Sequence, residues 1–374
     1  MLDLPPFARF GTRVATGLLD VTSDPAALDA AGFWAVCADF EGRPVCARFA
    51  DVREETVPAP VPGAWRGPSP GDWTSSLDRA AYTAGVRRIR EHIAAGQVYQ
   101  ANLCRVLTAP VEPEADVDAL TALLARGNPA PYAGTIRLPA HGIETATASP
   151  ELFLRRDGRV VESGPIKGTG RTEADLLDKD YAENVMIVDL VRNDLGQVCA
   201  TGSVTVPDLC AVEKHPGLVH LVSTVRGELR EGAGWPELLD AAFPPGSVTG
   251  APKSSALRII DALETAPRGP YCGGIGWVDA DRGTGELAVG IRTFWIDRAR
   301  GGSAVLRFGT GAGITWGSDP EAEWAETELK ASRLLAIASG TYEGTGSCEA
   351  KESREGTGPC EGKGSYEFEG EGLT

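Results

Sequence analysis

The sequence lacks several features that would place it in other classes of protein. No apolar run approaches the ~20 residues that a membrane-spanning helix needs, and the first residues lack the basic-then-apolar pattern of a secretory signal. The eight cysteines are scattered singly, without the Cys-x-x-Cys pairs typical of metal sites. No basic patch occurs, and the net charge of -16 disfavours nucleic acid and anionic membranes as partners. We therefore expect a cytoplasmic protein with reduced thiols that binds neither nucleic acid nor membrane.

Composition divides the 374 residues into three regions. Residues 1–72 alternate short apolar runs, as in 32–38 and 43–49, with turn residues, which predicts antiparallel strands followed by a linker rich in Pro and Gly. Residues 73–339 combine helix and strand patterns and are expected to form the main domain. From residue 340 a twelve-residue repeat rich in Gly and Glu has too little apolar surface to fold. Residues 340–374 are therefore predicted to be a disordered tail.

Apolar spacing predicts the elements of the main domain. Apolar residues recur every three or four positions from Tyr82 to Ile93, which predicts a helix with Ser75 as its cap and Gly96 as its end. Further helices are expected over 117–127, 178–191, 235–242, 253–264 and 319–338. Strands are expected over 98–107, 132–138, 151–162, 203–207, 218–229, 273–279, 286–297 and 303–309. Because few of these elements form βαβ units, the predicted class is α+β with large, mostly antiparallel sheets.

One lysine stands in an unusual setting, Glu162-Ser-Gly-Pro-Ile-Lys-Gly-Thr-Gly-Arg171. The glycines and the proline exclude a helix here, so Lys167 is expected on a loop at a strand end, where the backbone can approach a ligand closely. A desolvated lysine loses its proton more readily, and the neutral amine is a nucleophile. The alternative is a solvated lysine beside a turn.

Two predicted helices each carry a pair of carboxylates three residues apart. Asp180 and Glu183 share a face of one helix, and Glu323 and Glu326 share a face of the other. Each pair alone is typical of a solvated helix face, and acidic residues near a helix start also suit the helix dipole. Together the pairs could converge on Mg²⁺, which prefers a few carboxylates, waters and oxygens of an anionic substrate. A metal would let this acidic protein hold an acidic ligand.

Two glycine-containing segments are candidates for anion binding. Gly309-Thr-Gly-Ala-Gly313 follows a predicted strand, and its amides could cradle a carboxylate or phosphate, although its spacing does not fit the dinucleotide fingerprint. The loop 244–252 precedes a predicted helix, but Pro252 excludes a Walker motif because it stands where that motif needs glycine. A helix N-terminus for an anion remains.

Three single residues add further candidates. Arg292, within a predicted strand, could clamp a carboxylate or form a structural salt bridge. His220 lies on a strand, where a lone histidine is more often a satisfied core residue than a catalyst. Glu151 could serve as a general acid if it is buried near Lys167.

Taken in order, these segments resemble the chorismate-utilising enzymes. The resemblance covers residues 75–338, and its joint pattern is very specific even though most single pieces are weak. It implies an α+β fold with large antiparallel sheets packed as a sandwich and helices on the outside. The matching stretches are Gly96–Arg105, Ser149–Phe153, Pro165–Thr169, Asp180–Gly196, Val219–Thr224, Phe243–Lys253, Tyr271–Trp277, Ile291–Thr293, Gly309–Gly313 and Glu321–Lys330.

The resemblance also implies roles for matching residues. The family's magnesium ligands fall on Glu183 and Glu326, with Asp180 and Glu323 as direct or water-mediated partners. The carboxylate-binding positions fall on Ser247, Tyr271, Arg292, Gly311 and Gly313.

The remaining matches concern the reacting groups. His220 matches a histidine near the substrate ring, and Glu151 matches the general acid for the departing C4 hydroxyl. Water-using relatives have a lysine base where this chain has Gln100, which favours ammonia as the final nucleophile.

The lysine separates the two ammonia-using branches of the family. The anthranilate branch has Pro-Ile-Ala-Gly-Thr, whereas the aminodeoxychorismate branch has Pro-Ile-Lys-Gly-Thr, as here around Lys167. The resemblance therefore implies covalent catalysis by Lys167 on chorismate, with the anthranilate branch and a non-catalytic ligand-binding relative as alternatives. It also implies a separate glutamine amidotransferase subunit that supplies ammonia and a downstream lyase that acts on the product.

Overall fold

The computed structural model describes residues 5–42, 44–56, 61, 63–170, 172–215, 218–299 and 302–342, all within the structural unit Met1–Tyr342. Apart from residues 340–342, the segment predicted to be a disordered tail lies outside the described residues.

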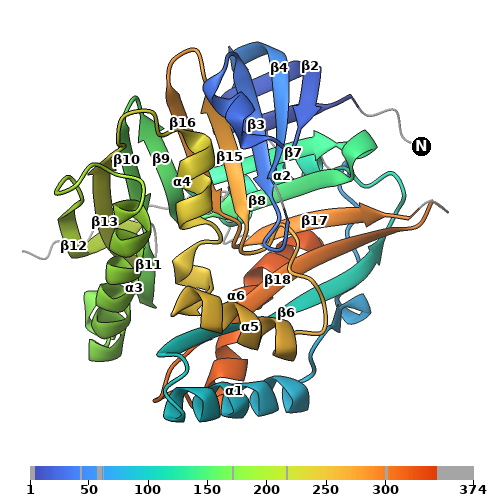
Figure 1. Cartoon of the computed structure of the whole chain (residues 1–374). Helices are drawn as coiled ribbons and strands as arrows, with labels where there is room; N and C mark the ends of the chain where they lie inside the picture. The colour runs from blue at the N-terminus through green and yellow to red at the C-terminus, as the bar shows by residue number, and fades with distance from the viewer. Residues whose placement is uncertain are drawn as a thin grey trace, which may run out of the picture. The chain divides into compact units, whose positions relative to one another are not determined.

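The strands of the described residues form one antiparallel ladder of 18 strands (Figure 1). Their bounds are β1 (Phe7–Phe10), β2 (Arg13–Thr22), β3 (Phe33–Ala38), β4 (Pro44–Glu54), β5 (Thr74–Ser75), β6 (Gln100–Val111), β7 (Tyr132–Leu138), β8 (Ile143–Ser149), β9 (Leu152–Asp157), β10 (Val160–Gly164), β11 (Ile166–Gly170), β12 (Thr205–His215), β13 (Leu218–Glu228), β14 (Gly250–Ala251), β15 (Gly274–Asp279), β16 (Thr284–Val289), β17 (Thr293–Arg298) and β18 (Ala304–Ile314).

The pairing order of these strands differs strongly from their order in the sequence. From β13, which pairs with both β11 and β12, the ladder runs β13–β10–β9–β16–β15–β3–β4–β2–β1–β7–β8–β17–β18–β6. Strands β5 and β14 pair with β6. The N-terminal strands β1 to β4 therefore sit in the middle of the ladder.

The two halves of the ladder bury their apolar faces against each other. Cys104 and Val106 of β6 and Trp295 of β17 share one core cluster with Val36 of β3 and Leu154 of β9. This packing confirms the predicted class, an α+β fold built on a large antiparallel sheet, and the sandwich that the resemblance implies.

Helices cover the outside of the sheet. Helices α1, α5 and α6 pack near β6 and β18, and α3 packs on β13 (Figure 1). Within the described ranges, none of the helices combines the length and apolar character needed to cross a bilayer. Their bounds are α1 (Arg79–Ala94), α2 (Val117–Gly127), α3 (Asp178–Gly196), α4 (Trp235–Ala242), α5 (Lys253–Leu263) and α6 (Pro320–Ala338).

Helix ends follow local capping chemistry. Asp319 caps α6 as predicted, because its carboxylate accepts hydrogen bonds from the backbone of Glu321 and Ala322. The prediction that Ser75 caps α1 is wrong. Asp78 accepts from the Ala81 backbone at 2.8 Å, whereas the Ser75 hydroxyl donates to the Leu77 carbonyl.

Several strand predictions need correction where a turn interrupts an apolar run. The strand expected over 151–162 is a hairpin of β9 and β10, and the strand expected over 286–297 is divided into β16 and β17. The sequence prediction missed β8 because its residues, Ile143-Glu-Thr-Ala-Thr-Ala-Ser149, contain few large apolar side chains.

Candidate active site

Lys167 lies within β11 rather than on a loop, which corrects the sequence prediction. Strand β11 pairs with β13, and its register shifts between Lys167 and Thr169, where Gly168 adopts a φ of +76°. Glycine suits this bulge because a Cβ there would also come within 2.9 Å of the Asp180 side chain. The Lys167 ammonium donates a hydrogen bond to the Ser247 carbonyl at 3.2 Å.

Glu151 lies between β8 and β9 and is only 4% exposed. Burial raises the pKa of this carboxyl, although a hydrogen bond from the Ser247 side chain and the charge of Lys167 oppose the shift. A backbone hydrogen bond from Ile166 and the charge of Lys330 also lower the pKa of Glu151. The candidate acid and the candidate nucleophile therefore meet at Ser247.

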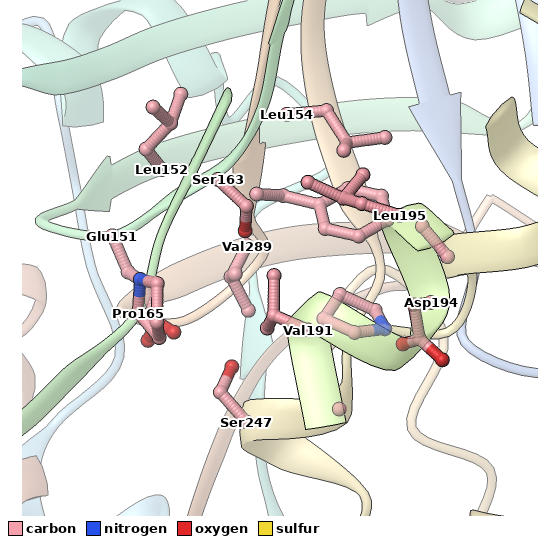
Figure 2. A pocket seen from close by; sticks show the side chains of 14 residues that line it. Glu151, Leu152, Leu154, Ser163, Pro165, Val191, Asp194, Leu195, Ser247 and Val289 are labelled. Atoms are coloured by element: carbon pink, nitrogen blue, oxygen red, sulfur yellow. The ribbon is translucent and has the colours of Figure 1, made fainter. Parts of the chain in front are cut away.

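A small cavity of about 20 Å³ adjoins this meeting point. In Figure 2, Glu151 and Pro165 lie on its left and Asp194 and Leu195 on its right, while Ser247 lies below. Its other walls are largely apolar, and its volume suffices for one molecule of the size of water.

The carboxylates predicted on two helices influence one another's pKa values. Burial raises the pKa of Glu183, Lys167 and Lys179 oppose the shift, and Asp180 and Glu326 add to it. Glu183 and Asp180 belong to α3, whereas Glu326 belongs to α6. The charges of Lys167, Asp180 and Glu326 therefore all act on Glu183, which indicates that β11, α3 and α6 bring these groups near one another.

The two carboxylates of α6 differ in their surroundings. Burial raises the pKa of Glu323, against a hydrogen bond from Ser318. Burial also favours the neutral form of Glu326, but Lys330, whose ammonium lies 2.6 Å from the carboxylate, lowers its pKa together with Lys179 and Lys167. Lys330 escaped the sequence prediction, although its position four residues after Glu326 on one helix face was a usable signal.

The carboxylates of α3 and α6 are suitable ligands for Mg²⁺, but they do not form a complete coordination shell. Among the described residues no three acidic, histidine or cysteine side chains gather closely enough to hold a metal by themselves. Asp180 uses one oxygen to accept from the Leu177 backbone at the start of α3. Magnesium commonly takes only one or two protein carboxylates and completes its shell with water and substrate oxygens, so these carboxylates, of which Asp180, Glu183 and Glu326 are partly exposed, suit it.

Arg292 offers a guanidinium suited to an anionic ligand. It stands between β16 and β17 with a φ of +52°, so its predicted place within a strand is wrong. Burial lowers the pKa of Arg292, and Arg333 adds to the effect. In the described part of the chain its half-buried side chain has neither a salt bridge nor a hydrogen bond, which leaves its donors available for a carboxylate.

Gly311 and Gly313 lie inside β18, which corrects the prediction that they follow a strand ending at residue 309. Gly311 pairs with Cys104 and Gly313 with Asn102, but the Cys104 and Asn102 amides bond elsewhere, to Glu264 and to the Thr249 carbonyl. The Gly311 carbonyl accepts from Lys330. Both glycines therefore direct their N–H groups away from β6, because alternate residues of an antiparallel pair face outward. These amides can donate to a carboxylate at the edge of the sheet.

Steric contacts explain the glycines in β18. A Cβ at Gly311 would lie 2.6 Å from the Leu103 carbonyl oxygen, and one at Gly313 would lie 2.5 Å from the Gln100 side-chain amide. Gln100 is fully buried, donates to Asn102 at 3.2 Å and leaves its own carbonyl oxygen without a partner among the described residues.

Tyr271 and His220 are buried to about the same extent as Glu151. The Tyr271 ring packs against Gly309, and its pKa is raised by burial and by nearby Cys104. His220 is 3% exposed on β13, at the register of Thr169 in β11 and Glu213 in β12.

Comparison with known proteins assigns this chain to a family. The sequence pattern of the family described as chorismate binding enzyme matches residues 26–336. Haloarcula marismortui anthranilate synthase component 1 1 is 40% identical over 275 residues, which cover 70% of this chain and 54% of the relative. Escherichia coli aminodeoxychorismate synthase component 1 is 38% identical over 276 residues, which cover 71% and 59%. The chain belongs to the chorismate binding enzyme family.

A solved structure agrees with this assignment. The crystal structure of a putative 2,3-dihydroxybenzoate-specific isochorismate synthase from Bacillus anthracis matches with a TM-score of 0.73 and 26% identity, covering 89% of this chain and 96% of that one. The chain spans little more than half the length of the two curated relatives.

Proposed function

We propose that this chain is an aminodeoxychorismate synthase component I, which converts chorismate and ammonia to 4-amino-4-deoxychorismate. The observation that carries the proposal is the meeting of Lys167 and Glu151 at Ser247, beside the carboxylates of α3 and α6. A binding protein would not need a nucleophile next to a buried acid with a raised pKa.

In the proposed reaction the Lys167 amine attacks C2 of chorismate. Both conjugated double bonds of the ring shift, from C1=C2 and C5=C6 to C1=C6 and C4=C5, and the C4–O bond breaks, while Glu151 donates a proton so that the hydroxyl leaves as water. Ammonia then adds at C4, both double bonds shift back, and the C2–N bond to Lys167 breaks. Two easier displacements replace one difficult displacement.

The other residues would bind and orient the substrate. Arg292 and the outward amides of Gly311 and Gly313 would hold carboxylates of chorismate. Magnesium, held by Glu183 and Glu326 with support from Asp180 and Glu323, would neutralise anionic oxygens. Gln100 replaces the lysine base of water-using relatives, and the ammonia would come from a glutamine amidotransferase partner.

The second candidate is an anthranilate synthase component I, because relatives of that name match at the same level of identity. Sequence identity therefore does not separate the two branches. Lys167 favours the aminodeoxychorismate branch, since aromatisation to anthranilate uses no covalent lysine.

The test is an assay of the purified chain with chorismate, Mg²⁺ and a high ammonium concentration, with products separated by chromatography. Aminodeoxychorismate from the wild type, reduced at least about 10⁴-fold in Lys167→Ala, would support both the branch and the nucleophile. Lys179→Ala is the matched control and should retain most activity, because Lys179 lies near the carboxylates but outside the proposed reaction.

Each other outcome points to a different reading. Anthranilate and pyruvate as products would place the chain in the tryptophan branch. Chorismate binding without turnover would indicate a non-catalytic relative. Undiminished synthesis by Lys167→Ala would refute covalent catalysis.

A further inference from the structure

A buried ion pair joins three helices behind the candidate site. The Lys253 ammonium lies 2.8 Å from the Asp194 carboxylate and also donates to the Ala242 carbonyl at 3.0 Å. The side chain of Asp194 is 7% exposed and that of Lys253 is 18% exposed. The pair therefore connects the end of α3, the end of α4 and the start of α5.

Both charges occupy helix ends that disfavour them. Asp194 stands in the last turn of α3, where the helix dipole is negative, and Lys253 is the first residue of α5, where the dipole is positive. Helix stability alone would select the opposite charges at these positions. The ion pair between Asp194 and Lys253 therefore offsets the unfavourable interaction of each charge with its own helix dipole.

The pair closes the loop between α4 and α5. Lys253 follows this loop directly and bonds to the carbonyl of Ala242, the residue that directly precedes it. Halfway along the loop stands Ser247, whose carbonyl accepts from Lys167 and whose side chain bonds to Glu151. The position of Ser247 therefore depends on how tightly the two loop ends are held.

The same loop rests against α3. A Cβ at Gly246 would lie 2.5 Å from the Leu190 side chain and 3.9 Å from the Asp194 carboxylate. Asp194 and Ser247 also line the same cavity, which ends at Glu151 (Figure 2). Helix α3 in turn carries Glu183, so one rigid element connects the candidate metal ligands, the ion pair and the loop.

We propose that Asp194 and Lys253 are positioning residues that fix Ser247 and, through it, align Glu151 with Lys167. This inference rests on the proposed function, since it assigns a purpose to Ser247 in that reaction. Neither residue touches the reacting atoms. Loss of the pair frees the loop, and a displacement of Ser247 by about 1 Å suffices to reduce turnover about 10–100-fold.

The test is a double-mutant cycle between Lys253→Met and Ser247→Ala, with kcat measured across pH. Ser247 donates to Glu151 and lowers its pKa, while Lys167 and Lys330 are the charged groups that also face this carboxyl. The limb of the pH–kcat profile that depends on Glu151 is identified by its absence in Glu151→Gln. Both single variants should therefore move this limb to higher pH. The double variant should be no more than about twofold slower than Ser247→Ala, because both changes remove one interaction.

Two further variants separate positioning from folding. Asp194→Asn combined with Lys253→Met removes both charges, so no unpaired charge remains buried, and it should still show the shifted limb. Arg298→Met breaks a comparable pair with Glu144, whose members are 25% and 3% exposed, on the distant end of β17. This control should lower thermal stability and leave the limb in place.

Three results would each overturn the inference. The two substitutions could reduce kcat by independent factors in the double variant, the pH limb could stay in place in Lys253→Met, or Arg298→Met could shift the limb as much as Lys253→Met. If the wild type does not turn over chorismate, the proposed function fails independently. The same cycle is then measured by the dissociation constant for chorismate, where coupling of Lys253 to Ser247 supports the positioning role and additivity overturns it.

Discussion

Two clusters of charged residues in this protein differ in how completely their charges are paired. Arg268 is fully buried and forms two hydrogen bonds to Glu264, at 2.7 and 2.9 Å, while the Val248 and Asn102 carbonyls accept its other donors. At the candidate active site, burial raises the pKa values of Glu151 and Glu183. The charges of the first cluster are fully paired within the protein, whereas protein partners do not fully compensate the burial of the carboxyl groups in the second cluster.

How completely the charges of a cluster are paired determines whether the cluster stabilises the fold or is available to bind a ligand. A saturated pair leaves nothing for a substrate, and breaking it leaves a buried charge without compensation. An unsaturated cluster lowers the stability of the unliganded protein, and ligands or a metal restore the balance. Variants in the two clusters should therefore affect stability with opposite signs.

Glu264→Ala should give the largest effect on stability. It leaves the guanidinium of Arg268 buried without its carboxylate and should lower the free energy of unfolding by about 3–5 kcal/mol. Chemical denaturation monitored by tryptophan fluorescence measures the change. Glu286→Ala, which breaks the more exposed pair with Arg155, is the control and should cost about 0–1 kcal/mol. Equal losses in the two variants would remove the distinction between saturated and exposed pairs.

Glu151→Gln should give the opposite sign. Proton transfer is lost, so turnover should fall about 10²–10³-fold, whereas the free energy of unfolding at pH 8 should rise by about 1 kcal/mol. The native pKa of Glu151 is raised above its usual value of 4.5, so the native state binds more protons than the unfolded state between these two values. The stability of the wild type therefore falls as pH rises through this window.

The gain in Glu151→Gln should accordingly appear above that window and vanish below pH 4.5. Thermal unfolding measured from pH 4 to pH 8 provides the comparison. A variant less stable than the wild type at pH 8 would show that Glu151 belongs with the saturated cluster instead.

Magnesium should give the smallest effect. At a concentration about tenfold above its dissociation constant it should stabilise the native state by about 1.4 kcal/mol, a rise in Tm of about 2–4 °C. Glu183→Gln combined with Glu326→Gln should abolish this rise, whereas Glu321→Gln on the exposed face of α6 should preserve it. A rise that persists in the double variant would place the metal elsewhere.

Local patterns in the sequence were sufficient for most elements but not for their interruptions. The apolar spacing of α1 and the Asp319 cap of α6 depend on neighbouring residues only, and both predictions hold in outline. The break between β16 and β17 depends on the left-handed backbone of Arg292, which lies inside an otherwise continuous strand pattern. Gly290 within this run was a local signal, because a Cβ there would lie 2.1 Å from the Pro270 carbonyl oxygen, but it does not specify the backbone of Arg292.

The candidate site shows the same division. The motif around Lys167 and the carboxylate pairs were recognisable because each is contiguous or follows helix periodicity. That they share one site with Glu151 follows from the pairing of β11 with β13 and the packing of α3 on β13, which link distant segments. The ion pair of Asp194 and Lys253 went unnoticed because nothing in the sequence joins the end of one helix to the start of another.

The order of strands in the ladder also has a consequence for synthesis of the chain. Strand β3 pairs with β15, whose residues 274–279 are made some 240 residues after Phe33–Ala38. At about 5–20 residues per second, the ribosome delivers β15 roughly 10–50 s after β3. During that time one edge of β3 stays without its native partner, so the nascent chain exposes an unpaired strand edge that other chains can pair with.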